Sequence, residues 1–304
     1  MTQDARRPFG RLLTAMVTPF RPDGALDVDG AGRLASYLVD QQGNDALVIN
    51  GTTGEAPTTT DAEKETLLRA VVEAVGDRAK VVAGVGTNDS RHTIELANAA
   101  EKAGAHGLLV VTPYYNKPPQ AGLLRHFTAV ADAAGLPILL YDIPQRTGTA
   151  IATETLCRLA GHERIVGVKD AKGNLAETGW VIRRTDLAYY SGEDALTLPM
   201  LAIGGVGVVG TSSHLTGPGT KQLIEAYERG EVATAQRLHH QLLPLFTGIF
   251  RTQGTILVKA ALAAHGLPAG PVRLPLVDAT EAEVAQLRAD CADAGLPLPA
   301  AGAA

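Results

Sequence analysis

The sequence has few cysteines and no concentration of basic residues. Two of its 304 residues are cysteines, and Cys157 and Cys291 lie too far apart to form a short metal-binding pair. We expect both to be reduced thiols in the cytoplasm, where disulfides are rare. Lys and Arg are scattered along a chain of net charge −5. Because nucleic-acid-binding proteins usually carry a basic face, we expect no nucleic-acid partner.

Long apolar runs and a secretion signal are also missing. No stretch of about 18 uninterrupted apolar residues occurs, which argues against a membrane span. The first residues, MTQDARRPFGRLL, contain two arginines but neither an apolar core nor a cleavage pattern, so export is not expected. With 45% hydrophobic and 19% charged residues, the chain has the composition of a folded protein with a sizeable core.

What the chain does contain is an alternation of short apolar runs with amphipathic segments, repeated eight times. The predicted strands are Leu12–Pro19, Ala46–Asn50, Val81–Val85, Gly107–Thr112, Pro137–Ile143, Ile165–Lys169, Leu187–Ser191 and Gly207–Thr211. Most are continuously apolar, as parallel strands covered on both faces are. Segments such as Ala62–Val75 have helical spacing between them, and Thr60 to Glu63 form a capping box at the start of that helix.

Eight such units in roughly 215 residues predict an α/β fold, a TIM (β/α)8 barrel. A doubly wound sheet is the competing arrangement, because periodicity counts the units without showing that the sheet closes. After about Gly217 there is no strand signal. Three helices are predicted there, at Lys221–Arg229, Val232–Phe250 and Thr255–His265. We therefore expect a barrel domain over residues 1–225 and a C-terminal helical domain over 226–304, with a frayed tail over 297–304.

The catalytic groups of a TIM barrel come from the carboxyl ends of its strands and the loops that follow. Polar segments stand at these positions: GTTGE at 51–55, TPYYN at 112–116, YDIPQRT at 141–147, GVKD at 167–170 and SGE at 191–193. Tyrosines are concentrated in these segments or beside them, at Tyr189 and Tyr190. Packing alone would not predict this concentration, so we expect a catalytic site at this end of the barrel.

Lys169 is the most informative of these residues. It follows the apolar run Ile165–Val168, so its neighbours are expected to be buried, and lysine is rarely buried without a function. A free lysine has a pKa of about 10.4, and only roughly one in a thousand is neutral near pH 7.5. Burial would lower that pKa and make the amine nucleophilic. We interpret Lys169 as a Schiff-base-forming residue; the alternative is a surface lysine at the end of a strand.

Side chains near Lys169 in the predicted barrel could complete such a site. Tyr141, at the end of the neighbouring strand, could transfer protons to a forming imine, or it could be a half-buried packing residue. Thr52 and Thr53 lie between two glycines, where backbone N–H groups and hydroxyls would suit a carboxylate; an ordinary turn would have the same sequence. Arg146 could bind a second carboxylate in a bidentate manner, or be a solvated loop residue.

Gly205 to Gly210 match the pattern G-x-G-x-x-G of dinucleotide-binding proteins. That fingerprint must follow a strand, open a helix and precede an acidic residue by about 20 residues. Here the match lies within the eighth predicted strand, and the next acidic residue is Glu225. We therefore do not expect a nucleotide cofactor.

Four motifs in order resemble the dihydrodipicolinate synthase family, within the N-acetylneuraminate lyase superfamily, and its actinobacterial branch in particular. They are GTTGE at 51–55, TPYYNKP at 112–118, YDIPQRTG at 141–148 and GVKDAKG at 167–173. The resemblance extends from TAMVTPF at 14–20 to VRLP at 272–275, which is nearly the whole chain.

The resemblance implies a lyase of lysine and diaminopimelate biosynthesis that needs no metal or organic cofactor. Pyruvate would form a Schiff base with Lys169, and its enamine would attack the aldehyde of L-aspartate 4-semialdehyde. The implied catalytic residues are Lys169, Tyr141, Thr52 and Tyr115, and the implied substrate-binding residues are Thr53, Arg146, Gly192 and Val209. In this family Tyr115 would come from a partner subunit, so a cytoplasmic homotetramer, built as a dimer of dimers, is expected.

The chain departs from the family pattern after its eighth strand. The family commonly has a pattern like I-S-V-x-A-N where this chain has Val209-Gly210-Thr211-Ser212-Ser213-His214. Two other activities share the lysine and the tyrosine: N-acetylneuraminate lyase and 2-keto-3-deoxy sugar acid aldolase. Thr52, the tyrosine pair and Arg146 favour the synthase over both. A catalytically silent pyruvate-binding paralogue would be expected to lack Lys169 or Tyr141.

The resemblance also bears on inhibition by L-lysine. Sensitive members of the family tend to carry histidine where this chain has Asp61 and Lys64, and glutamate where it has His92. Since His92 cannot neutralise a lysine ammonium and Lys64 would repel it, we expect weak inhibition or none.

Overall fold

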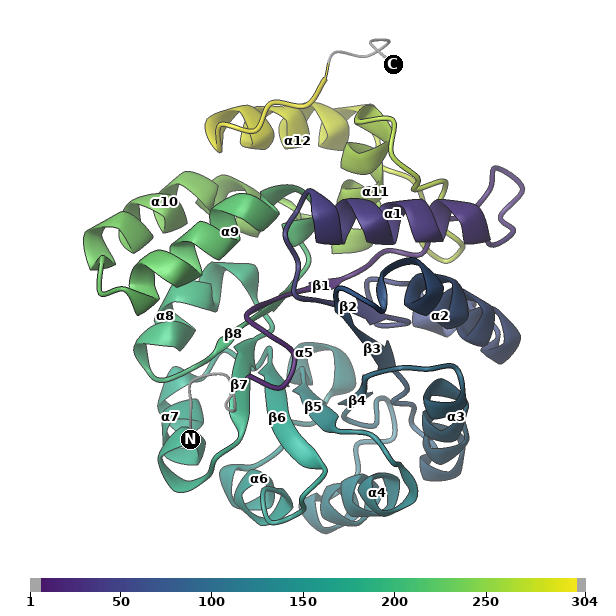
Figure 1. The fold of residues 1–304 in the computed structure, drawn as a ribbon, viewed down its shortest axis with the longest axis vertical. Helices are drawn as coiled ribbons and strands as arrows, with labels where there is room; N and C mark the ends of the chain where they lie inside the picture. Colours follow the sequence, from purple (N-terminus) through teal and green to yellow (C-terminus); the bar gives the residue numbers. More distant parts are fainter. Residues whose placement is uncertain (1–6, 300–304) are drawn as a thin grey trace.

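The computed structural model describes residues 7–299, and eight parallel strands form a closed barrel at its centre (Figure 1). The strands are β1 (Leu12–Ala15), β2 (Ala46–Ile49), β3 (Lys80–Gly84), β4 (Gly107–Val111), β5 (Ile138–Asp142), β6 (Ile165–Asp170), β7 (Ala188–Ser191) and β8 (Gly207–Gly210). They pair in chain order, and β8 pairs with β1. This closure confirms the predicted barrel and excludes a doubly wound sheet, whose outermost strands would not pair.

Helices cover the outside of the barrel and follow the strands in turn. They are α1 (Val28–Asp40), α2 (Asp61–Val75), α3 (Ser90–Lys102), α4 (Gln120–Ala133), α6 (Thr153–Leu159), α7 (Leu175–Arg184), α8 (Thr197–Ala202) and α9 (Ser213–Glu228). Three short helical turns, η2 (Ala56–Thr58), α5 (Pro144–Thr147) and η3 (Asp194–Leu196), follow β2, β5 and β7. The predicted capping box is confirmed: the Thr60 hydroxyl accepts a hydrogen bond from the Glu63 N–H, and the Glu63 carboxylate accepts one from the Thr60 N–H.

Strand side chains alternate between the helix layer and the barrel interior. The interior is filled by apolar residues that include Leu13, Val48, Val82, Leu109, Leu139 and Val209. Phe9 closes the amino-terminal end of the barrel, where it lies so close to Gly107 that a Cβ there would be 2.3 Å from its ring. The interior is therefore a packed core, and only the carboxyl-terminal end is left for a site.

The segment after the barrel contains α10 (Val232–Gly248), α11 (Gly254–Ala264) and α12 (Glu281–Asp293), which lie beside α9 and α1 in Figure 1. The prediction missed α12 because few of its residues are buried, so its apolar period is weak. Its start does carry a capping box, formed by Thr280 and Glu283, and this signal could have revealed it. Of the tail predicted to fray, residues 300–304 lie outside the described part of the chain.

The predicted helix starting at Lys221 was also too short, because α9 begins at Ser213 and continues through Pro218. A proline inside a helix leaves the carbonyl four residues earlier without its usual partner. Here that carbonyl belongs to His214 and accepts a hydrogen bond of 3.4 Å from the Tyr37 hydroxyl. A distant side chain thus compensates for the proline, which local sequence could not indicate.

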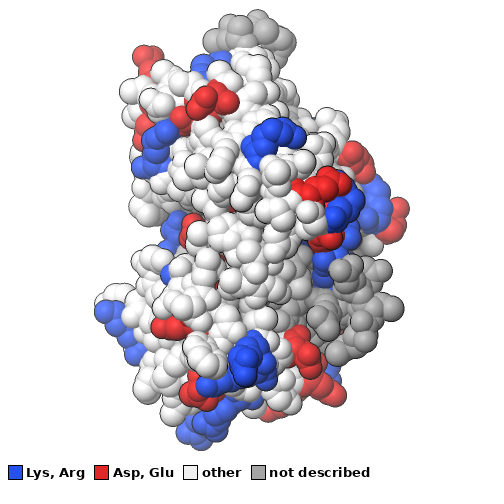
Figure 2. Space-filling model, turned by 90° about the vertical axis from the view of Figure 1, so that its left-hand side faces the viewer, with Lys and Arg blue, Asp and Glu red and all other residues white. Residues whose placement is uncertain are grey.

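The surface of the protein has no extended area of one charge on the face shown in Figure 2, where Lys and Arg alternate with Asp and Glu. Within residues 7–299, no helix combines the length and the apolarity needed to cross a membrane.

Candidate active site

Lys169 and Tyr141 face each other in the mouth of the barrel. Lys169 lies near the end of β6 and Tyr141 near the end of β5, and the two residues are paired directly across these neighbouring strands. The Lys169 Nζ lies 4.3 Å from the centre of the Tyr141 ring. Only 5% of Lys169 and 6% of Tyr141 are exposed. The structure thus places an amine and a phenol together in a site that is almost closed to solvent.

Burial changes the protonation of both groups. It lowers the pKa of Lys169 to about 8, although the negative charges of Asp194 and Glu193 oppose the shift. At that pKa, about a quarter of the amine is neutral near pH 7.5, compared with roughly one in a thousand for a free lysine. Burial also raises the pKa of Tyr141, so its phenol stays protonated, while Arg146 and a hydrogen-bonding contact with Thr52 oppose that shift. The pair therefore combines a usable nucleophile with a proton donor.

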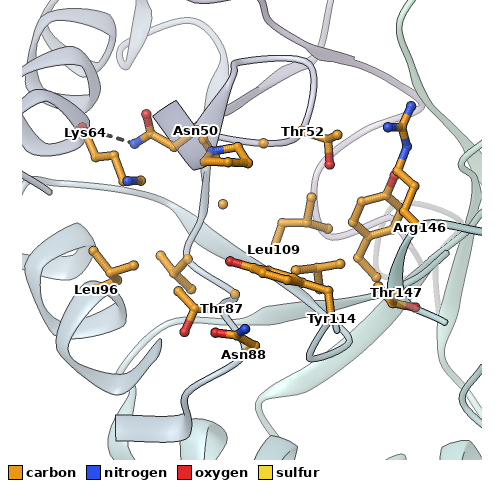
Figure 3. A pocket seen from close by; sticks show the side chains of 18 of the residues that line it. Asn50, Thr52, Lys64, Thr87, Asn88, Leu96, Leu109, Tyr114, Arg146 and Thr147 are labelled. Atoms are coloured by element: carbon orange, nitrogen blue, oxygen red, sulfur yellow. Dashed lines mark hydrogen bonds between the residues drawn. The ribbon is translucent and has the colours of Figure 1, made fainter. Parts of the chain in front are cut away.

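A cavity of about 580 Å³ opens at this end of the barrel. It is lined by residues that include Thr52, Tyr141, Arg146, Tyr114 and Tyr115. Figure 3 shows Thr52 and Arg146 at one side of this cavity, and Asn50 and Lys64 at the other. Arg146 lies on α5 and is exposed, so its guanidinium can reach a ligand that enters from solvent.

The turn that carries Thr52 and Thr53 is held by hydrogen bonds within its own backbone and by one from Thr18. The Gly54 N–H donates to the Gly51 carbonyl at 3.1 Å, and the Gly54 carbonyl accepts a hydrogen bond of 2.6 Å from the Thr18 hydroxyl. A Cβ at position 54 would lie 3.1 Å from the Met16 carbonyl, so glycine fits there best. The turn leaves the Thr53 hydroxyl 3.3 Å from that of Thr211, at the end of β8.

Asp194 fixes the end of β8, a role that the sequence analysis did not identify. Its buried carboxylate accepts hydrogen bonds from the Thr211 N–H at 3.1 Å, from the Ser212 N–H at 3.1 Å and from the Ser212 hydroxyl at 2.5 Å. Gly210 is needed beside it, because a Cβ there would lie 2.6 Å from the carboxylate. The position of Asp194 directly after the SGE segment, at the end of a strand, was the signal that could have identified it.

The segment after β8 that departs from the family pattern directs most of its side chains into the core. His214 is fully buried; its Nε2 accepts a hydrogen bond of 3.2 Å from the Val17 N–H, and its Nδ1 lies 2.8 Å from the Thr211 carbonyl. The Ser213 hydroxyl lies 2.6 Å from that of Thr14. Thr211 is the residue of this segment whose side chain reaches Thr53, so its hydroxyl is the part of the departure closest to the site.

Gly192 directly follows β7, and Val209 lies on β8, the next strand around the barrel. The Gly192 N–H donates to the Asp170 carbonyl at 2.7 Å, and a Cβ on Gly192 would lie 3.0 Å from that same oxygen. Val209 is fully buried, pairs with Leu13 and packs in the inner cluster of the barrel.

The tyrosines do not all belong to the site. Tyr115 is 89% exposed and holds a left-handed backbone with φ of 74°. Tyr190 points into the barrel, but its hydroxyl donates to the Gly10 carbonyl at 3.0 Å. Tyr189 packs in the outer cluster between the strands and the helices. The concentration of tyrosines in the sequence thus combines site residues with packing residues.

In the part of the chain that the structure describes, no three His, Cys, Asp or Glu side chains gather in a way that could hold a metal ion. What the arrangement offers instead is covalent chemistry: a buried amine of lowered pKa, a protonated phenol, a turn with hydroxyls and N–H groups, and an accessible guanidinium.

Comparison with known proteins identifies relatives over nearly the whole chain. The chain is 71% identical to a 4-hydroxy-tetrahydrodipicolinate synthase of Acidothermus cellulolyticus, over 97% of this chain and 96% of that protein. It is 62% identical to 4-hydroxy-tetrahydrodipicolinate synthase 2 of Streptomyces coelicolor, over 98% and 99%. A crystal structure of the synthase from Cyanidioschyzon merolae with lysine bound superposes with a TM-score of 0.93 at 44% identity, over 95% and 99%.

A family model also covers the barrel and most of the helices after it. It describes the dihydrodipicolinate synthetase family and matches residues 8–294. The match includes every residue placed around Lys169 above. The chain belongs to the dihydrodipicolinate synthetase family.

Proposed function

We propose that this chain condenses pyruvate with L-aspartate 4-semialdehyde through a Schiff base on Lys169 and produces 4-hydroxy-tetrahydrodipicolinate for lysine and diaminopimelate biosynthesis. The observation that carries the proposal is the buried pair of Lys169 and Tyr141, which face each other at the barrel mouth. The activity agrees with that of relatives that are 60–71% identical to this chain.

The reaction begins when the neutral Lys169 amine attacks the keto carbon of pyruvate. Tyr141 donates a proton to the resulting carbinolamine, water leaves, and an imine forms. Loss of a methyl proton gives an enamine, whose carbon forms a bond to the aldehyde carbon of the semialdehyde. The amino group of the semialdehyde then attacks the imine carbon, closes the ring and releases the Lys169 amine. Every proton removed is returned within the cycle, so no metal or organic cofactor is required.

The other site residues bind the substrates and transfer protons. Thr52 lies near the Tyr141 phenol, where it opposes the rise in the pKa of that group, and it extends the proton relay. Thr53 and the N–H groups of its turn bind the pyruvate carboxylate, while the exposed Arg146 binds the carboxylate of the semialdehyde. The backbones of Gly192 and Val209 border the pyruvate.

Two sister activities use the same lysine and tyrosine, and one experiment separates them. A coupled assay with pyruvate and L-aspartate 4-semialdehyde should show turnover, whereas N-acetylneuraminate and a 2-keto-3-deoxy sugar acid should not be cleaved at comparable rates. Cleavage of either sugar acid at the higher kcat/KM would overturn the proposal. A catalytically silent pyruvate-binding paralogue would show no turnover in any arm.

Tyr115 completes the relay from a partner subunit. In one chain its side chain is almost fully exposed at the edge of the cavity, and its backbone is left-handed. A second copy of the chain would cover such a residue, which makes a dimer the smallest active unit within a homotetramer.

Mixing two variant subunits tests whether Tyr115 acts in the active site of its partner subunit. Tyr115→Phe and Lys169→Ala subunits should each have little activity alone. After dissociation and reassociation together they should recover up to about a quarter of wild-type activity, because some hybrid dimers contain one intact site. Hybrids confirmed by mass spectrometry that have no more activity than the parents would show that Tyr115 acts within its own chain.

L-lysine should inhibit weakly or not at all, because the outer part of the cavity has no free carboxylate for its ammonium. The Asp61 carboxylate lies 2.9 Å from the His92 ring and 3.7 Å from the Lys64 ammonium. The side chain of Lys64 is 14% exposed and also donates to the Thr59 carbonyl at 2.5 Å. A bound lysine would therefore have to displace existing partners and meet a like charge.

The measurement is the initial rate at saturating pyruvate against L-lysine concentration. Half-inhibition is expected above about 1 mM L-lysine. The variant His92→Glu supplies a carboxylate, so it should reach half-inhibition at a lower lysine concentration. Half-inhibition of the unmodified protein at sub-millimolar lysine would contradict this prediction.

We also propose that residues 1–225 form the catalytic barrel domain and residues 226–304 a C-terminal helical domain, although α9 itself extends to Glu228. A cytoplasmic location suits a biosynthetic enzyme that acts on these small polar substrates.

A further inference from the structure

Helix α11 lies beneath the turn that carries Thr52 and Thr53, although it is about 200 residues away in the sequence. Two of its residues contact the turn. Thr255 and Lys259 are four positions apart, so they lie on one face of the helix. They reach Thr53 and Glu55, which belong to the same turn.

The first contact is a hydrogen bond to the backbone of a substrate-binding residue. The Thr255 hydroxyl donates to the Thr53 carbonyl at 2.9 Å, and Thr255 is fully buried. The same end of the helix also approaches Thr211, since a Cβ on Gly254 would lie 3.4 Å from the Thr211 methyl group. The Thr53 carbonyl and the Thr211 methyl group therefore both lie against the first turn of α11.

The second contact is a buried ion pair. The Lys259 ammonium lies 2.7 Å from the Glu55 carboxylate, and the two side chains are 3% and 1% exposed. Lys259 also donates to the Pro271 carbonyl at 2.8 Å, and Glu55 accepts the Arg273 N–H at 2.8 Å. Removing one partner of such a pair leaves an uncompensated buried charge, which is much more costly than the pair itself. Burial lowers the pKa of Lys259, and Glu55 opposes this.

Arg273, in the chain after α11, also contacts the turn and the Glu55 partner of the ion pair. The Arg273 guanidinium donates to the Thr58 carbonyl at 2.8 Å and pairs with Glu63, at the start of α2. The ring of Phe20 lies 4.3 Å from the Lys259 ammonium and 4.1 Å from the Arg273 guanidinium. Glu55 itself has a left-handed φ of 57°, a conformation that an L-residue rarely holds without support. The turn is thus also supported from outside the barrel.

We propose that Glu55, Lys259 and Thr255 are positioning residues for pyruvate, through which the helical segment after the barrel holds Thr53 in the orientation that binds the pyruvate carboxylate. This inference rests on the proposed role of Thr53. A carboxylate contact is made equally before and during the reaction, so its misplacement should raise KM with little change in kcat.

The test is steady-state kinetics on the full chain with three variants. Thr255→Val has nearly the same shape and loses one hydrogen bond, so it should raise the pyruvate KM about 3- to 10-fold. Thr255→Ser, which restores the hydroxyl, should return KM close to its original value. Glu55→Gln leaves Lys259 with a neutral partner, and it should raise the pyruvate KM by at least about 10-fold. In all three, kcat and the KM for the semialdehyde should change about 2-fold or less.

The matched control is Asp290→Asn, which breaks another ion pair in the same helical segment, between Arg251 and Asp290, away from the turn. It should lower the melting temperature as a structural ion pair does and leave the pyruvate KM unchanged. If Glu55→Gln and Thr255→Val lower stability like the control and leave the pyruvate KM unchanged, the positioning role is wrong.

The variant Thr53→Val tests separately the assignment on which this inference rests, which is that Thr53 binds the pyruvate carboxylate. A normal pyruvate KM in Thr53→Val would show that Thr53 does not bind the carboxylate, whatever the other variants do. If Glu55→Gln does not fold, the double variant Glu55→Gln/Lys259→Met removes both charges and should fold, because no unpaired charge remains. The inference then requires a raised pyruvate KM in that double variant and in Thr255→Val.

Discussion

Replacing Lys169 with alanine is expected to lower kcat/KM on the order of 10⁴-fold or more, because the covalent intermediate can no longer form. The fold should remain intact, since the buried Lys169 amine interacts with Asp194 and Glu193 through their charges, without a direct hydrogen bond to either carboxylate. The measurement is the coupled condensation assay with circular dichroism as a check of folding. A folded variant that keeps more than about one-hundredth of the activity would contradict the proposed mechanism.

The control lysine for this experiment has to be chosen from the structure. Lys172 is only three residues away, but its side chain is 9% exposed and lies 3.0 Å from Glu177 and 3.8 Å from Asp142. Burial raises the pKa of Asp142 to about 7, and Lys172 opposes that shift. Replacing Lys172 would therefore disturb the residue that follows Tyr141. Lys102, exposed at the end of α3, is the better control and should tolerate alanine with no loss of activity.

Replacing Tyr141 with phenylalanine is expected to lower kcat on the order of 10²- to 10³-fold, since the ring stays and only the proton donor is lost. Phenylalanine keeps the ring next to Lys169, so the amine should remain buried and nucleophilic. Imine formation should therefore still occur on Lys169, but more slowly. The measurement is kcat together with the rate at which borohydride traps the pyruvate adduct.

Tyr190→Phe is the matched control for Tyr141→Phe. Tyr190 also points into the barrel, from β7, but its hydroxyl donates to the Gly10 carbonyl. Its loss should cost about 1 kcal/mol of stability and leave kcat unchanged. Equal kinetic losses in the two variants would mean that Tyr141 acts through packing and not as a proton donor.

The barrel and the central pair of the site could be predicted from the sequence because both depend on local patterns. Each strand is an apolar run with turn residues after it, and the observed strands start and end within two residues of the predicted bounds, except that β1 ends at Ala15, before the predicted Pro19. Lys169 and Tyr141 stand at the ends of consecutive strands, and consecutive strands pair in a barrel. Their proximity follows from that rule.

The parts that could not be predicted depend on contacts between distant segments. The position of Asp194 after a strand end marks it as a candidate, but its role becomes clear only from the hydrogen bonds between its carboxylate and the end of β8. Thr255 and Lys259 belong to a strongly apolar helix that looks like an ordinary packing helix, and their partners in the turn are about 200 residues away. Likewise, α9 continues through Pro218 because Tyr37 supplies a hydrogen bond. In each case the decisive partner is absent from the neighbouring sequence.

Borohydride trapping of the pyruvate imine, followed by peptide mass mapping, tests the central claim most directly. Incubation with pyruvate and borohydride should attach one reduced pyruvate unit to the peptide that contains Lys169, and protein treated without pyruvate should carry none. The burial of this amine and its pKa of about 8 favour modification there over the exposed lysines, whose ordinary pKa is about 10.4. Adduct on a different lysine, or none while the enzyme turns over, would show that the reaction does not proceed through Lys169.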